Sequence, residues 1–111
     1  MERPVHELRH YITEGGRDLV QEWLDRLPDT QARVAVLRRL DRIAAGNFGD
    51  LGYCRDGVWE LRVDLGPGYR VYFARDTDPI VILLCGGDKR KQQADIARAV
   101  RYWKDAQQGH R

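Results

Sequence analysis

Residues 59–73 read WELRVDLGPGYRVYF, and this stretch decides the fold. Apolar and polar residues alternate on both sides of the central Gly-Pro-Gly turn, a pattern typical of two half-buried strands joined as a hairpin. The apolar residues have odd numbers in both strands, so the pairing must keep the odd positions on one face. The register that does so places Arg62 opposite Arg70, and Glu60 opposite Tyr72, on the other face.

Hydrophobic periodicity and turn residues predict the elements around this hairpin. The predicted strands cover residues 5–12, 51–55 and 80–85, and the predicted helices begin after Asp18, after Asp29 or Thr30, and after Asp88. Residues 80–85 are apolar at every position, as in a strand covered on both faces. The second helix has an apolar stripe that is expected to face the core, formed by Val36, Leu37, Leu40, Ile43 and Ala44. This order predicts a small single α+β domain over residues 1–111, with an N-terminal strand, a helical hairpin, an antiparallel β-meander and a C-terminal helix.

Length and composition exclude several classes of protein. The 111 residues are 42% hydrophobic and 32% charged, which is the balance of one globular domain. No apolar run approaches the roughly 20 residues of a membrane-spanning helix, so no membrane partner is expected. The N-terminal residues lack the apolar core of a secretory signal, and the two cysteines, Cys54 and Cys85, are too few for a disulfide framework. We therefore expect a cytoplasmic protein.

Charge is distributed unevenly along the chain. Residues 89–111 contain seven Lys and Arg against two acidic residues, while the whole chain is only +2. A basic segment of this kind is expected in a protein that binds a polyanion. A solvated basic helix would give the same pattern.

Arg62 and Arg70 are the first candidates for a functional site. Two guanidinium groups directly opposite each other on a sheet repel by up to about 1 kcal/mol. A sequence that keeps them either neutralises them with Glu60 or presents them to an anion. Lys89 follows Gly86-Gly87 near a predicted helix N-terminus, where backbone N–H groups favour anions. Together the three basic side chains can surround a phosphate.

Other side chains extend this candidate site. Five residues are expected to stack on a base, move a proton or contact RNA: Tyr72, Tyr102, Lys91, Arg98 and Arg101. The alternative is a solvated sheet face with one ion pair and tyrosines that pack on their neighbours. His6 and His10 are expected on the surface, and no metal-ligand motif is present, so we expect neither a metal nor another cofactor.

The motifs ELR at 60–62, GPGYRVYF at 66–73 and GGDK at 86–89 together resemble the RelE/ParE toxin superfamily. Within it they are most similar to the HigB-like branch of addiction-module killer proteins, and the resemblance covers essentially the whole chain. It implies a RelE/ParE-like fold and the toxin of a type II toxin–antitoxin system. It also implies a ribosome-dependent endoribonuclease that cuts translated mRNA, with a cognate antitoxin, usually a helix-turn-helix protein, as partner.

The resemblance further implies roles for individual residues. Arg62, Arg70 and Lys89 match basic positions that contact the scissile phosphate in RNA-cleaving relatives, and Tyr102 is a candidate for proton transfer. Some of those relatives have a histidine near the site, which this sequence lacks, so the general acid and base stay open. The alternatives are a ParE-like toxin that binds and poisons DNA gyrase without cutting RNA, and an inert basic domain that binds only an antitoxin or nucleic acid.

Overall fold

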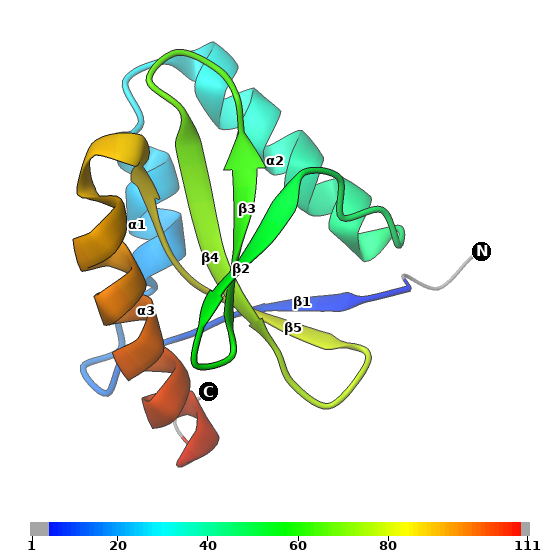
Figure 1. Cartoon of the computed structure of the whole chain (residues 1–111), viewed down its shortest axis with the longest axis vertical. Helices are drawn as coiled ribbons and strands as arrows, with labels where there is room; N and C mark the ends of the chain where they lie inside the picture. The colour runs from blue at the N-terminus through cyan, green and yellow to red at the C-terminus, as the bar shows by residue number, and fades with distance from the viewer. Residues whose placement is uncertain (1–4, 110–111) are drawn as a thin grey trace.

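A five-stranded mixed sheet lies at the centre of the molecule, with its strands in the order β1-β5-β4-β3-β2 (Figure 1). The computed structural model describes residues 5–109. β1 runs parallel to β5, and the other neighbouring strands are antiparallel. The strands are β1 (Glu7–His10), β2 (Leu51–Arg55), β3 (Val58–Val63), β4 (Tyr69–Arg75) and β5 (Ile80–Asp88).

Helices cover both faces of this sheet and make it the middle of three layers (Figure 1). α1 (Leu19–Arg26) and α2 (Thr30–Ala44) pack on one face, and α3 (Gln92–Gln107) packs on the other. A short 3-10 turn, η1 (Lys89–Lys91), joins β5 to α3. The predicted α+β class, with its helical hairpin, meander and terminal helix, is confirmed and is consistent with a RelE-like fold.

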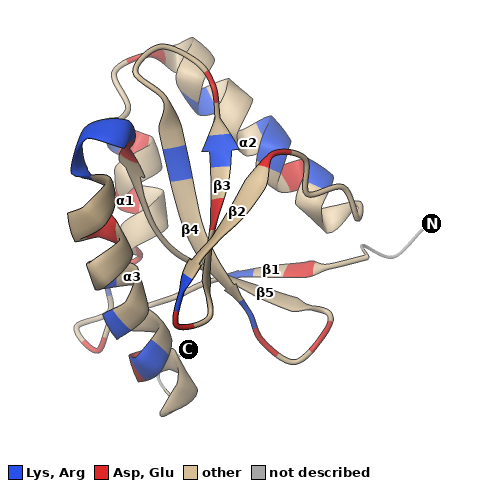
Figure 2. Ribbon diagram, in the orientation of Figure 1, with Lys and Arg blue, Asp and Glu red and all other residues tan. Residues whose placement is uncertain are grey.

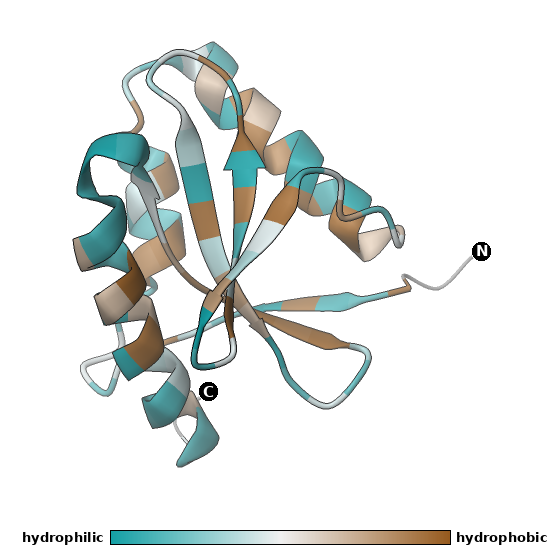
Figure 3. Ribbon diagram, viewed as in Figure 1, coloured by the Kyte–Doolittle hydropathy of each residue, from teal (hydrophilic) through white to brown (hydrophobic). Residues whose placement is uncertain are grey.

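Alternating side chains divide the core between these layers. Leu61, Val71 and Phe73 are fully buried under α1 and α2. Val58 and Ala74 are fully buried against α3 on the opposite face. β5 contributes to both clusters, which explains why it is apolar at successive positions (Figure 3).

Local signals in the sequence locate the helix ends. The Asp18 carboxylate accepts a hydrogen bond from the Gln21 N–H, and Asp29 accepts one from Gln31, so both aspartates cap helices as predicted. Asp88 caps η1 instead of α3, since its carboxylate accepts from the Arg90 N–H. The predicted final helix therefore begins a few residues later, at Gln92 of α3.

The structure differs from the sequence expectation in four further places. β5 continues through Gly86 and Gly87 to Asp88, beyond the predicted end at residue 85, because both glycines pair with β4. β1 is shorter than the predicted strand over residues 5–12. Leu37 is 43% exposed, because α2 presents Val36, Leu40 and Ile43 to the sheet and Leu37 lies about 100° further round the helix. The even-numbered face of the hairpin is covered by α3 over part of its length and is not a solvated face.

No helix in the described part of the chain is both long enough and apolar enough to cross a membrane.

Candidate functional site

Arg62, Arg70 and Lys89 line one cavity of about 260 Å³, here called the basic pocket. The register of β3 and β4 places Arg62 directly opposite Arg70, as predicted. Lys89 reaches the same place because its N–H donates to the carbonyl of Gly68, at 3.0 Å, in the hairpin turn. Figure 2 shows basic bands next to each other on β3 and β4, and another at the turn that precedes α3. The remaining lining comes from Asp50, Val63, Asp64, Gly66, Pro67 and Gly68.

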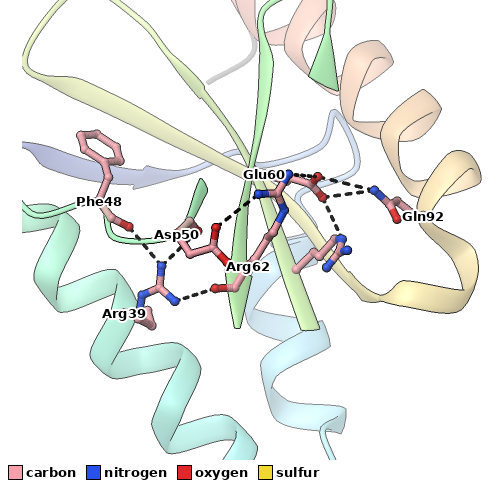
Figure 4. A network of polar contacts seen from close by, with 7 residues as sticks. Arg39, Phe48, Asp50, Glu60, Arg62 and Gln92 are labelled. Atoms are coloured by element: carbon pink, nitrogen blue, oxygen red, sulfur yellow. Dashed lines mark hydrogen bonds and ion pairs between the residues drawn. The ribbon is translucent and has the colours of Figure 1, made fainter. Parts of the chain in front are cut away.

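A buried carboxylate holds the two arginines together. Glu60 Oε2 lies 2.8 Å from Arg70 Nε, and Glu60 Oε1 lies 3.3 Å from Arg62 Nη2. The Glu60 side chain is 6% exposed and that of Arg70 is 13% exposed, whereas that of Arg62 is 38% exposed. Gln92 on α3 donates its amide N–H to both Glu60 oxygens at 3.4–3.5 Å (Figure 4). Glu60 therefore offsets the repulsion, while Arg62 keeps part of its guanidinium open to the pocket.

Arg62 is held by three further contacts. Its guanidinium donates to Asp50 at 3.2 Å, and this hydrogen bond is the main reason that the pKa of Arg62 is raised. Arg39 on α2 donates to the Arg62 carbonyl at 2.5 Å and to the Phe48 carbonyl at 3.1 Å (Figure 4). A Cβ at Gly52 would lie 2.3 Å from Arg62 Nη2, so the guanidinium rests directly on the β2 backbone. Arg62 is thus held in place before any ligand binds.

Lys91 and Arg98 line a neighbouring cavity of about 450 Å³, here called the Trp23 cavity. Arg98 Nη2 lies 2.6 Å from Asp95 Oδ1, and the Asp95 side chain is only 5% exposed. Trp23 and Arg26 of α1 form another wall of this cavity. Two of the residues predicted to contact RNA are therefore next to the basic pocket but not in it.

Three predicted site residues lie elsewhere. Tyr72 is fully buried because α3 covers that part of the sheet, so the prediction that it stacks on a base is wrong. Burial, reinforced by the charge of Glu60, raises the pKa of Tyr72 and keeps its hydroxyl protonated. Tyr102 stacks on Tyr11 with ring centroids 5.2 Å apart, and it lines neither cavity. Arg101 is exposed on α3 and also lines neither cavity.

The histidines occupy positions other than those expected. His6 is buried with its ring 4.9 Å from that of Phe48, and His10 is half-buried with Nδ1 2.8 Å from an Asp18 oxygen. Both are held by structural contacts, which correct the expected surface placement. Within residues 5–109, no three His, Cys, Asp or Glu side chains are grouped so that they could hold a metal ion.

Sequence reasoning only half identified Glu60 and missed Trp23 entirely. Glu60 was recognised as a possible counter-charge, but its burial depends on Gln92 and α3, which are distant in the sequence. Trp23 reads as one of the apolar positions of an amphipathic helix, and no local signal separates a half-exposed Trp from a core one. One signal in the sequence is Gly86, because the absence of a Cβ there lets the Trp23 ring pack directly on the β5 backbone.

Two comparisons relate the chain to known proteins. The family model described as "Phage derived protein Gp49-like (DUF891)" matches residues 22–104. A Haemophilus influenzae protein described as an uncharacterized protein is 47% identical over 77 residues, which are 69% of this chain and 78% of that protein.

The family match corrects the resemblance inferred from the motifs. The matching model describes a family different from the RelE/ParE superfamily, so the assignment to the HigB-like branch is wrong. The motifs at 60–62, 66–73 and 86–89 reflect the β3–β4 hairpin and the turn after β5, which fix the geometry of the basic pocket. They indicate a shared arrangement of elements and not membership of that branch.

Proposed function

The chain belongs to the Gp49-like family of phage-derived proteins, a family that indicates a toxin-like or addiction-module protein, and from this premise we propose that it is a type II toxin that cleaves translated mRNA on the ribosome. The observation that carries the proposal is the convergence of Arg62, Arg70 and Lys89 on one pocket. Each comes from a different element, so the convergence is a product of the fold. Such a pocket fits a phosphodiester that gains negative charge during a reaction.

The proposed reaction is transfer of a phosphoryl group within the RNA strand. The 2′-oxygen forms a bond to the adjacent phosphorus, the bond from phosphorus to the 5′-oxygen breaks, and the products are a 2′,3′-cyclic phosphate and a 5′-hydroxyl. The proton of the 2′-hydroxyl must go to a base, and the 5′-oxygen must receive a proton. Charge accumulates on the non-bridging oxygens in the transition state, where nearby guanidinium groups stabilise it.

These tasks are proposed for residues that line the pocket. Arg62 and Arg70 face the phosphate oxygens, and the Lys89 ammonium gives a proton to the 5′-oxygen. Two carboxylates, Asp50 and Asp64, also line the pocket. Asp50 is paired with Arg62, whereas Asp64 makes no ion pair with the described residues, so Asp64 is the proposed base. Glu60 is a positioning residue, because its carboxylate is buried between two arginines.

The proposed partners are mRNA on the ribosome and a cognate antitoxin that silences the toxin. A small helix-turn-helix protein is the antitoxin expected from the sequence analysis. The basic pocket is open in the isolated chain, with Arg62 38% exposed and Lys89 exposed. A cell that makes this protein therefore needs a partner that blocks access to the pocket.

A cell-free translation reaction tests the proposal. Adding the protein should produce new 5′-hydroxyl ends in the mRNA only when ribosomes translate it. Lys89→Ala and Arg62→Ala should abolish these ends. Lys89 is exposed, so its removal should change stability by no more than about 0.5 kcal/mol. Arg62→Ala should also stay folded, because Arg70 remains as the ion-pair partner of buried Glu60. The matched control is Lys104→Ala, which removes an exposed lysine on α3 outside the pocket and should cleave as the wild type does.

Two results would contradict the proposal. Uncut mRNA together with inhibition of DNA gyrase would support the alternative of a toxin that acts by protein binding. Full cleavage by Lys89→Ala would show that Lys89 is not a catalytic residue. Circular dichroism of each variant identifies any loss that comes from unfolding.

A further inference from the structure

Three cavities lie in series on this side of the molecule, each sharing at least one lining residue with the next, and together they are here called the groove. A cavity of about 300 Å³ lies between the Trp23 cavity and the basic pocket. It shares Trp23, Arg26, Asp88 and Arg90 with the Trp23 cavity, and it shares Pro67 with the basic pocket. The groove thus leads from Arg98 on α3, past Trp23, and over the hairpin turn to Arg62 and Lys89.

Trp23 is a rigid aromatic surface in the middle of this groove. A Cβ at Gly86 would lie 2.2–2.7 Å from three carbons of the Trp23 six-membered ring, so the indole packs directly on the backbone of β5. The Tyr69 ring contacts it at a centroid distance of 6.3 Å and an interplanar angle of 62°. Trp23 is nevertheless half-exposed and lines two of the three cavities. The indole therefore packs on the β5 backbone while part of its surface is accessible from the groove, which suits stacking of a flat group.

The groove is basic around this indole. Arg90 is paired with Asp88 at 2.9 Å, and Arg98 is paired with the buried Asp95 at 2.6 Å. Two further cations, Arg26 and Lys91, make no ion pair with any described residue and are exposed. They are available for an anionic ligand that lies along the groove.

We propose that this groove binds single-stranded RNA, with one base stacked on Trp23 and flanking phosphates near Arg26 and Lys91. The proposal rests on the proposed function, because it supplies the path by which the strand reaches Arg62 and Lys89. Exposed aromatic rings between cations are the arrangement that recognises unpaired nucleotides. An acidic peptide would satisfy the cations but would make no use of an open indole.

Binding of a short 2′-O-methyl oligoribonucleotide tests the proposal, since this probe lacks the 2′-hydroxyl that the cleavage step needs. The wild type should bind it at low salt. Trp23→Leu should weaken binding about tenfold, and Trp23→Phe should restore most of it, because stacking is worth about 1–3 kcal/mol per base. The control is Trp59→Leu, since Trp59 is also half-exposed and packs against the same core cluster, but it contacts Tyr53 edge-to-face outside the groove.

The salt dependence of binding gives an independent measurement. Arg26→Gln should lower the slope of log affinity against log salt by about 0.7, the value for one phosphate contact with a single strand. Lys104→Gln should leave the slope unchanged, because this exposed lysine on α3 lines none of the three cavities.

The outcomes separate this proposal from the proposed function. Failure of the wild type to bind the probe, or equal binding by Trp23→Leu and wild type, would overturn the groove as an RNA site. Cleavage that depends on Lys89 would then still support the endoribonuclease. Binding that depends on Trp23, without any mRNA cleavage, would support the groove as an RNA site and contradict the proposed endoribonuclease activity. A third outcome is that the oligonucleotide does not bind but an oligoglutamate peptide does. If binding of the peptide depends on Arg26 and is unaffected by Trp23→Leu, the groove binds an acidic protein segment and not RNA.

Discussion

Arg62 is the residue on which the account depends most. It lies opposite Arg70, shares Glu60 with it, and is also held by Asp50 and by the β2 backbone at Gly52. The sequence predicts that the two arginines lie opposite each other, because the apolar residues of both strands occupy odd-numbered positions and must share one face. It does not predict the contacts at Gly52 and Asp50, because they arise from a second strand pairing whose register the sequence does not specify.

Gly52→Ala is predicted to impair activity without impairing the fold. The new Cβ would lie 2.3 Å from Arg62 Nη2, so the flexible end of Arg62 must move out of its position. We expect cleavage to fall at least about tenfold, while the free energy of unfolding changes by less than about 1 kcal/mol, because the atoms in the way belong to the end of a side chain and not to the backbone. Parallel cleavage and denaturant-unfolding measurements check this. Unchanged cleavage by Gly52→Ala would mean that the observed position of Arg62 is not the active one.

The Cys54 thiol is predicted to report on the charges of the site. Burial, and then the charge of Glu60, raises its pKa from 9.0 to about 11, while Arg62 and Arg70 lower it. At about pH 8 the thiolate fraction, and with it the rate of alkylation, should be about a hundredfold lower than for a free thiol. The rate should keep rising up to about pH 11, and Arg62→Gln should raise the pKa further because it removes a neighbouring cation.

The raised pKa of Cys54 also makes the stability of the fold depend on pH. The folded state holds the Cys54 proton more tightly than the unfolded chain, so this contribution to stability is complete below pH 9.0 and is lost as pH rises to about 11. Alkylation is best followed in a Cys85→Ala background, where Cys54 is the remaining cysteine. A rate that levels off near pH 9 would contradict the burial of Cys54 beside Glu60.

The β3–β4 hairpin shows how an element carries the site. Its alternating sequence was enough to predict both strands and their register, because few registers keep the apolar residues of both strands on the same face. It did not predict that Tyr72 is buried while Arg62 is partly exposed on the same face. That difference depends on where α3 crosses the sheet, which is set by packing between distant segments. The exposure of Leu37 on α2 has a similar origin, since the orientation of a helix is fixed by the surface that receives it.

Glu60→Gln is predicted to destabilise the hairpin. It would leave Arg70, whose side chain is 13% exposed, without its counter-charge beside Arg62. Removing one partner of a buried pair costs about 3 kcal/mol, whereas Asp50→Asn, at an exposed pair, should cost less than about 1 kcal/mol. Chemical denaturation of the two variants measures the difference. Equal stabilities would mean that the buried carboxylate is not what holds the two arginines together.

The three-layer arrangement of the whole molecule separates two surfaces. The basic pocket and the groove lie at one end of the sheet near η1, while Val34 and Leu37 form an exposed apolar strip on α2, at 39% and 43% exposure. The sequence predicted the helices and strands that form the layers. It did not predict that the basic and the apolar surfaces lie on different elements, because that depends on how the layers pack together. An exposed apolar surface is therefore present on α2, outside the lining of the basic pocket.

Neutralisation by the antitoxin is predicted to work at a distance from the pocket. Leu37→Glu should weaken antitoxin binding at least about tenfold, because a charge would enter an apolar contact. Arg62→Ala combined with Lys89→Ala should leave the affinity within about twofold, and association should slow at high salt because surface charges steer the encounter. Calorimetry and stopped-flow kinetics give both quantities. Loss of affinity in the pocket variant, with none in Leu37→Glu, would instead show direct masking of the pocket.

The most direct test of the central claim is the mapping of RNA 5′ ends in bacteria after induction of the protein. The account predicts an early arrest of protein synthesis, with new 5′-hydroxyl ends confined to translated regions. These ends should be absent when Lys89→Ala is induced to the same level, and present with Lys104→Ala. Intact mRNA together with damaged DNA and an SOS response would contradict the account, since it would assign the toxicity to a target other than RNA.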